Sequence, residues 1–243
     1  MTPQAKKTVL ITGGSRGIGH SAVLKFKENG WNVATCATGE ARLQQSPADL
    51  KFLCNVAKAH EVKRGIEKVL HTFGQIDAVV NNAGLAGSNP LSPESDDEFW
   101  LRILDVNLNG TYYMSKYVAP HLPDRTGRII NIASVLALKG VPDQTAYCAA
   151  KHAVLGFTRA FAQHLAPRKI TVNAICPGWV RTEMAEGRMK EIGMTENDIS
   201  TSVPLARFVE PSEVADLIYF LASSEASAMI TGQALTIDGG TLP

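Results

Sequence analysis

Short apolar runs alternate with longer amphipathic segments along the whole chain. About seven runs are rich in β-branched and other apolar residues, and each has the length of a single strand. These predicted strands lie at 7–12, 31–37, 51–56, 77–84 (with the turn that follows it), 128–133, 171–176 and 233–238. Runs that are apolar at nearly every position are typical of strands buried on both faces of a parallel sheet.

The segments between the runs carry apolar residues at helical spacing. Helices are predicted at 21–29, 58–72, 96–122, 145–165 and 211–222. Strands and helices alternate without a repeat or a linker, and right-handed crossovers then give a doubly wound sheet. We therefore predict an α/β protein: a single Rossmann domain over residues 1–243, with about seven parallel strands and helices on both faces.

Two connecting segments stand apart from this alternation. Residues 85–95 form a polar loop with two prolines. Residues 181–203 mix methionines with charged residues, and we predict that they form a mobile lid, a helix–loop segment that closes on a substrate. A surface helical excursion with no such role is the alternative for the second segment.

Charge and cysteine usage narrow the class of protein. The 243 residues carry 24 basic and 23 acidic side chains with no basic block, which argues against nucleic acid and anionic membranes as partners. The start of the chain lacks the apolar stretch of a signal peptide, and no run is long enough to span a bilayer. Four cysteines show neither C-x-x-C pairs nor zinc spacing, which favours buried reduced thiols, no metal and a cytoplasmic protein.

A glycine-rich turn, T-G-G-S-R-G-I-G at 12–19, joins the first strand to the first helix. Glycines let the backbone approach a pyrophosphate, and the start of the helix supplies free N–H groups and partial positive charge. The turn therefore predicts a dinucleotide site, although its G-x-x-x-G-x-G spacing differs from the common G-x-G-x-x-G. A glycine turn without a ligand is the alternative.

The end of the second strand bears on the choice of dinucleotide. An acidic residue there suits NAD, whereas a nearby basic residue suits a 2′-phosphate. Here the strand ends at Thr38, no carboxylate occurs before Glu40, and Arg16 and Arg42 are close by. This pattern favours NADP(H), unless Arg16 is only a solvated turn residue. Asn55, at the end of the third strand, is expected to bond the adenine edge.

Candidate catalytic residues follow the fifth strand. Ser134 lies at the end of that strand, which is where ligands bind in open α/β sheets. Tyr147 and Lys151 are four residues apart on a helix, so they share one face, and an ammonium beside a phenol lowers the phenol pKa. Such a tyrosine can exchange a proton with an alcohol or carbonyl. Asn107, in the middle of a helix, is unfavourable there unless its side chain is used.

Together these motifs resemble the short-chain dehydrogenase/reductase family in its compact form. The resemblance covers almost the whole chain, and it looks closest to 3-oxoacyl-[acyl-carrier-protein] reductases and polyketide ketoreductases. It rests on the glycine turn at 12–19, N-N-A-G at 81–84, Asn107, Ser134, Y-C-A-A-K at 147–151, P-G at 177–178 and I-T-G-Q-A-L-T-I-D-G-G at 230–240.

The resemblance implies a role for each catalytic candidate. Tyr147 would be the general acid, and Ser134 would bond the substrate oxygen. Lys151 would bind the nicotinamide ribose and lower the tyrosine pKa, and Asn107 would hold a water that passes protons to Lys151. The residues implied to line the cofactor are Gly13, Ser15, Arg16, Ile18, Thr38, Asn55, Val56, Asn82, Tyr147, Lys151 and Val180.

The activity implied is NADPH-dependent reduction of the ketone of a 3-oxoacyl thioester, possibly on an acyl carrier protein, as in fatty acid biosynthesis. The family also implies a homotetramer, built through the helices that bear Asn107 and Tyr147 and through the last helix and strand. An NAD(P)-dependent dehydrogenase of a free hydroxy acid, secondary alcohol or sugar is the main alternative. A sugar-nucleotide epimerase or dehydratase lacks support from the glycine spacing, and the intact catalytic residues argue against a non-catalytic NADP-binding regulator.

The substrate itself is less well specified. Lys139, Val141, Asp143 and Gln144, between the serine and the tyrosine, are expected to face it. Lys139, Arg125 and Arg128 are candidate basic residues at the mouth of the site for a carrier protein, although each has plain solvated surface as its alternative.

Overall fold

A computed structural model describes residues 6–242 of the protein. Residues 1–5 and 243 lie outside the described residues, and with them most of the N-terminal segment that we expected to lack a signal peptide. In the described part of the chain, no helix is both long and apolar enough to cross a membrane.

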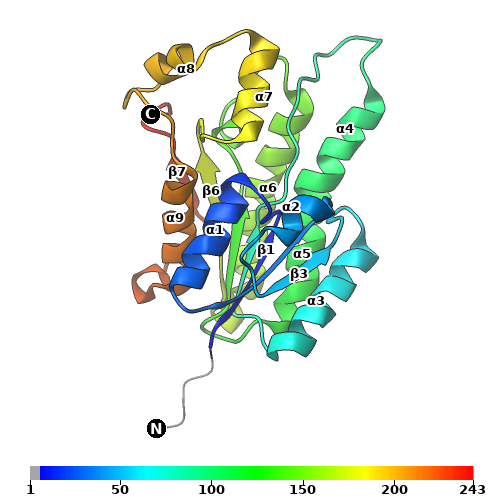
Figure 1. The fold of residues 1–243 in the computed structure, drawn as a ribbon, viewed down its shortest axis with the longest axis vertical. Coiled ribbons are helices and arrows are strands. Elements are labelled where there is room, and N and C mark those ends of the chain that lie inside the picture. The colour runs from blue at the N-terminus through cyan, green and yellow to red at the C-terminus, as the bar shows by residue number, and fades with distance from the viewer. Residues whose placement is uncertain (1–5, 243) are drawn as a thin grey trace.

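One sheet of seven parallel strands forms the centre of the molecule (Figure 1). Its strand order is β3-β2-β1-β4-β5-β6-β7, so the order reverses between β1 and β4. The strands are β1 Thr8–Thr12, β2 Asn32–Ala37, β3 Leu50–Leu53, β4 Ala78–Asn81, β5 Arg128–Ile132, β6 Thr171–Pro177 and β7 Ala234–Ile237. The predicted doubly wound parallel sheet is confirmed, and its reversal point is where such folds bind ligands.

Helices cover both faces of the sheet (Figure 1). α1 and α9 pack together on one face, and α3, α5 and α6 lie on the other. The helices are α1 Gly17–Glu28, α2 Glu40–Gln44, α3 Ala59–Phe73, α4 Asp97–Leu104, α5 Gly110–Val118, α6 Thr145–Leu165, α7 Glu183–Ile192, α8 Glu196–Ser202 and α9 Pro211–Ser223.

The two faces explain why the strands are apolar throughout. Successive side chains of a strand point to opposite faces. Val9 and Ile11 of β1 therefore pack with α1 and α9, whereas Leu10 between them packs with the helices of the other face. All three are fully buried. Each such side chain contributes about 1.5–3 kcal/mol through burial, so both layers of helices are held to the sheet by apolar contacts.

The predicted helix at 96–122 differs most from the structure. It consists of α4, a single π-helical turn at Asp105–Asn109, α5, and a 3₁₀ turn at Ala119–His121. π-helical turns are rare, and they occur often at functional sites. The short helix α2 was not predicted because five residues carry too little periodicity. The third strand is shorter than predicted, since Asn55 Oδ1 accepts from the Ala57 N–H at 3.1 Å and turns the chain there.

The segment 181–203 contains two helices, α7 and α8, at the end of the molecule that also holds the carboxyl ends of the strands (Figure 1). Thr182 caps α7, with its Oγ1 accepting from the Ala185 N–H, and Thr195 caps α8 in a capping box with Asp198. Gly193 ends α7 with φ of 67°, a left-handed conformation that glycine adopts without strain. These caps explain a helix–turn–helix segment in a region without a clear apolar period.

Candidate active site

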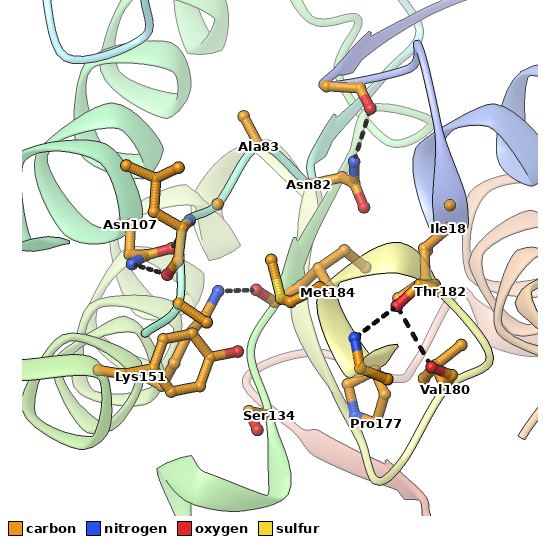
Figure 2. Close-up of a pocket in the computed structure, with 18 of the residues that line it drawn as sticks. Ile18, Asn82, Ala83, Asn107, Ser134, Lys151, Pro177, Val180, Thr182 and Met184 are labelled. Atoms are coloured by element: carbon orange, nitrogen blue, oxygen red, sulfur yellow. Dashed lines mark hydrogen bonds between the residues drawn. The ribbon is translucent and has the colours of Figure 1, made fainter. Parts of the chain in front are cut away.

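A cavity of about 680 Å³ lies at the carboxyl ends of the central strands. Figure 2 shows its wall, with Asn107 and Lys151 on one side of the view and Ile18, Thr182 and Val180 on the other. Every residue that we predicted for catalysis or for the cofactor lines this cavity: Gly13, Ser15, Arg16, Ile18, Thr38, Asn55, Val56, Asn82, Asn107, Ser134, Tyr147, Lys151 and Val180. The fold thus brings together residues separated by more than a hundred positions.

Ser134 and Tyr147 meet inside the cavity. Ser134 follows β5, and its Oγ accepts from the Leu136 N–H at 3.1 Å, so the chain turns directly after the strand. The Ser134 side chain also acts on the Tyr147 phenol and lowers its pKa, so the two hydroxyls lie near one another. The start of α6 is fixed by Thr145, whose Oγ1 donates to Asn89 Oδ1 at 2.7 Å. Two hydroxyls from different elements are therefore held side by side.

Burial raises the pKa of Tyr147 to about 12, and the interaction with the Ser134 side chain opposes this rise only in part. We expected a lowered pKa because of Lys151, so the predicted direction is wrong for the protein alone. The reason is that burial penalises the charged phenolate, and the neighbouring Cys148 and Cys176 raise the pKa further. Tyr147 therefore keeps its proton at neutral pH.

Lys151 is 4% exposed, which is unusual for a lysine. Its Nζ donates to the Ile132 carbonyl at 2.8 Å (Figure 2) and lies 5.5 Å from the centre of the Tyr147 ring. Burial lowers its pKa to about 8. An ammonium with this pKa gives up and takes back a proton readily at neutral pH. The helix face that the four-residue spacing predicted therefore lines the cavity, with Lys151 buried and Tyr147 half-buried.

Asn107 lies in the π-helical turn, and both ends of its amide are used. Its Nδ2 donates to the Leu85 carbonyl at 2.8 Å, and its Oδ1 accepts from the Leu85 N–H at 3.1 Å. A Cβ on Gly84 would lie 2.7 Å from that Oδ1 and 3.7 Å from the Lys151 Nζ. The unfavourable mid-helix asparagine is explained, because its side chain holds the segment after β4 against the π-helical turn.

The glycine turn leaves open the space that a pyrophosphate needs. Gly13 has φ of 71°, and a Cβ on Gly19 would lie 2.3 Å from the Gly13 carbonyl. The Asn82 Nδ2 donates to the Thr12 carbonyl at 2.9 Å, which ties this turn to the one after β4. α1 begins without a side-chain cap and without an acidic residue in its first turn. These features fit an anion at the start of the helix.

The basic candidates for the mouth of the site have different positions. Lys139 lines the cavity, as do Val141, Asp143 and Gln144. Arg125 and Arg128 lie before or at the amino end of β5, at the edge of the sheet opposite Ser134, so they were wrong as residues of the mouth. The Arg128 side chain instead donates to backbone carbonyls, including that of Gly127 at 2.9 Å. Residue type suggested the mouth for both arginines, whereas the direction of β5 places them at its other end.

Three lining residues of the segment 181–203 were not singled out from the sequence. Thr182, Glu183 and Arg188 all line the cavity. The Thr182 methyl group lies 3.2 Å from where a Cβ on Gly17 would stand, so this segment packs on the glycine turn. Arg188 pairs with Asp143 and donates to Ser88 at 2.8 Å. A threonine at a helix start is a visible signal, whereas nothing local marks the two charged residues.

The fold and the site define a dinucleotide-binding oxidoreductase. A family model described as enoyl-(acyl carrier protein) reductase matches residues 13–241. The 3-oxoacyl-[acyl-carrier-protein] reductase FabG of Staphylococcus aureus is 38% identical over 96% of this chain and 97% of its own length. The chain belongs to the short-chain dehydrogenase/reductase family, as its motifs predicted.

Solved structures agree with this assignment. A variant of actinorhodin polyketide ketoreductase, solved with NADPH, is 34% identical and superposes with a TM-score of 0.91 over 99% of both chains. The aldohexose dehydrogenase of Thermoplasma acidophilum, in ligand-free form, is 33% identical with a TM-score of 0.88 over 97% of this chain and 94% of its own. The same fold is thus found in a polyketide ketoreductase and in an aldohexose dehydrogenase.

Proposed function

We propose that the protein reduces the ketone of a 3-oxoacyl thioester with NADPH. The observation that carries this proposal is one cavity that holds both the Ser134–Tyr147 pair and the glycine turn. A hydride donor bound along the turn would lie next to the hydroxyls that receive the reduced oxygen. The thioester class is supported by the reductases to which the chain is 38% identical over nearly its full length.

The residues of the cavity fit NADPH. The cofactor supplies the hydride when it is bound. Gly13, Ser15 and Ile18 would hold the pyrophosphate at the start of α1, and Asn55 and Val56 would flank the adenine. Arg16 and Thr38 would bind the 2′-phosphate, since no carboxylate follows β2 before Glu40. Asn82 and Val180 would border the nicotinamide half of the site.

Tyr147 would donate the proton that the ketone oxygen needs. With its pKa raised to about 12, the phenol is protonated at neutral pH and serves as an acid toward an oxygen that gains negative charge. Ser134 would donate a hydrogen bond to the same oxygen, where it stabilises that charge. Lys151 would contact the ribose hydroxyls and return a proton to Tyr147. Asn107 would position a water that supplies protons to Lys151. It would do so by holding the π-helical turn in place through its bonds to Leu85.

We infer that residues 181–203 act as the lid. Arg188 of α7 contacts Asp143 and Ser88, which belong to the two loops beside the catalytic helix. Its side chain is only 15% exposed, which supports a contact that would close one side of the cavity. Opening the lid would break these contacts together. A lid of this kind would exclude water from the reaction and admit a long acyl chain between α7 and the loop 139–144.

We also propose a cytoplasmic homotetramer that takes its substrate from an acyl carrier protein. The four cysteines are free and buried, which suits a reducing compartment. Leu101 of α4 is 58% exposed, and Tyr112 of α5 lies with its ring 6.1 Å from that of Phe157 of α6. An apolar and aromatic surface across these helices is the kind of surface that a subunit interface covers.

The experiment that tests the proposed chemistry replaces Tyr147 by phenylalanine. Tyr147→Phe should lower kcat by about 10²–10⁴-fold, the usual contribution of a general acid, yet leave the Kd for NADPH within about twofold. Tyr113→Phe is the matched control, because Tyr113 lies in α5 away from the cavity lining. A Tyr147→Phe enzyme that retains most of its turnover would disprove the role assigned to the phenol.

A further inference from the structure

Two arginines converge on one carboxylate at the edge of the cavity. Arg16 Nη1 lies 2.8 Å from Glu183 Oε2, and Arg42 Nη1 lies 2.6 Å from the same oxygen. The three residues come from the glycine turn, from α2 and from the start of α7. The contacts span 167 and 141 positions of the chain, so only the fold brings these side chains together.

The arrangement has the chemistry of a phosphate site. Guanidinium groups match the oxygens of carboxylates and phosphates alike. Hydrogen bonds from Arg42, the larger effect, and from Arg16 hold the pKa of Glu183 below its usual value, so the carboxylate is charged. Arg16, Thr38 and Glu183 line one cavity, at the end where the 2′-phosphate of the proposed cofactor would bind.

All three side chains of this cluster are open to solvent, so a competing anion can reach the two arginines. The side chains of Arg16 and Arg42 are each 54% exposed, and that of Glu183 is 49% exposed. Ion pairs at such exposure are individually weak. A phosphate carries more charge than a carboxylate and offers three acceptor oxygens. It therefore competes well for two arginines that a single carboxylate oxygen now shares.

We propose that Glu183 is a cofactor-specificity residue, whose carboxylate holds the place of the 2′-phosphate until NADPH displaces it. NADH has no such phosphate and leaves the contact of Glu183 with both arginines intact. Because Glu183 is the first residue of α7, its release also removes two of the contacts that tie the start of the lid to the glycine turn and to α2. This inference rests on the proposed NADPH preference and on Arg16 as a phosphate ligand.

The test measures binding without turnover. Glu183→Gln removes the competing charge and keeps the shape of the side chain. It should tighten binding of 2′,5′-ADP and of NADPH by about three- to thirty-fold, as expected for the loss of two weak ion pairs. The Kd for NADH should stay within about twofold. Titration calorimetry measures the Kd for 2′,5′-ADP. Fluorescence titration measures the Kd values for NADPH and NADH.

Glu186→Gln is the matched control, since Glu186 is an exposed acid on the same helix. Among residues 6–242 it has no ion-pair partner within 4.0 Å. It should leave all three Kd values within about twofold. If Glu183→Gln binds 2′,5′-ADP no more tightly than the unmodified protein, the inference is wrong. Equal tightening by Glu186→Gln would also overturn it, because net charge alone would then explain the effect.

Arg16→Ala separates this inference from the proposed function. If Arg16→Ala weakens NADPH binding while Glu183→Gln leaves it unchanged, Arg16 is still a phosphate ligand and only the role of Glu183 is wrong. If Arg16→Ala leaves NADPH binding unchanged, the phosphate site is elsewhere and both fail. Because Glu183 is half exposed, Glu183→Ala is a second variant that should fold, and it should tighten 2′,5′-ADP in the same direction.

Discussion

The buried amine of Lys151 makes a prediction about stability as well as catalysis. Burial lowers its pKa from 10.5 to about 8. One unit of pKa shift corresponds to about 1.4 kcal/mol. The lowered pKa therefore means that a charged Lys151 destabilises the folded protein by about 3 kcal/mol. Lys151→Met removes the charge with a side chain of similar length, but leaves the Ile132 carbonyl without its donor, at about 1–3 kcal/mol. At pH 7 the inactive variant should therefore be as stable as the unmodified protein, or more stable by up to about 2 kcal/mol.

The pH dependence has a definite sign. Below pH 8, Lys151 is charged in both the folded and the unfolded chain, and the full cost applies. Between about 8 and 10.5, the folded chain has lost this proton while the unfolded chain keeps it, so stability rises with pH. Above 10.5 both are neutral. The unmodified protein should thus gain about 2 kcal/mol relative to Lys151→Met between pH 7 and pH 9.5.

Urea unfolding followed by tryptophan fluorescence measures this difference. The two proteins are compared at both pH values and at one protein concentration, because an oligomer would make stability depend on concentration. Measurements stop at pH 9.5, since the raised Tyr147 pKa lowers stability as pH rises through about 10 to 12. Lys190→Met, at an exposed lysine of α7, is the control and should show no relative gain. If the free energy of unfolding changes equally with pH in Lys151→Met and in the unmodified protein, the lowered pKa of the buried Lys151 is refuted.

Three further substitutions test other parts of the site. Arg16→Ala should raise the KM for NADPH about tenfold or more and leave that for NADH within about twofold, because it removes a phosphate ligand; initial rates with each cofactor decide this, and a preference for NADH in the unmodified protein would contradict it. Gly84→Ala should lower the melting temperature and kcat together, at about 1–3 kcal/mol, because its Cβ would stand 2.7 Å from Asn107 Oδ1; an unchanged melting temperature would show that Asn107 moves freely. Arg188→Ala should raise the KM for the substrate several-fold with the NADPH Kd unchanged, because it frees the proposed lid from Asp143; equal KM values would exclude this contact as a closure.

Much of the fold was predictable because local pattern and position in the sheet agree. The apolar runs marked strands buried on both faces, and the end of the fifth strand marked Ser134 as a residue of the ligand-binding edge. The prediction was wrong for two arginines whose position relative to the strand direction was not considered. Arg125 and Arg128 precede their strand, so they lie at the edge of the sheet away from the cavity. Their type suggested a carrier protein, but their place in the strand excludes them from the mouth.

Other features depended on contacts that no local pattern reveals. Asn107 of the π-helical turn bonds to Leu85, 22 positions earlier, and the ion pairs of Glu183 join parts of the chain more than a hundred residues apart. The pKa of Tyr147 was predicted in the wrong direction because spacing reveals a neighbouring charge but not the degree of burial. Burial comes from tertiary packing, and here it dominates the pKa of both Tyr147 and Lys151.

The proposed reaction is tested most directly by initial rates with acetoacetyl thioester and with free acetoacetate, each with NADPH and with NADH. We predict that kcat/KM is highest for NADPH with the thioester, by about tenfold or more over either NADH or the free acid. Turnover of the free acid or of a sugar with no turnover of the thioester would contradict the proposed substrate class. A kcat/KM as high with NADH as with NADPH would contradict the proposed cofactor.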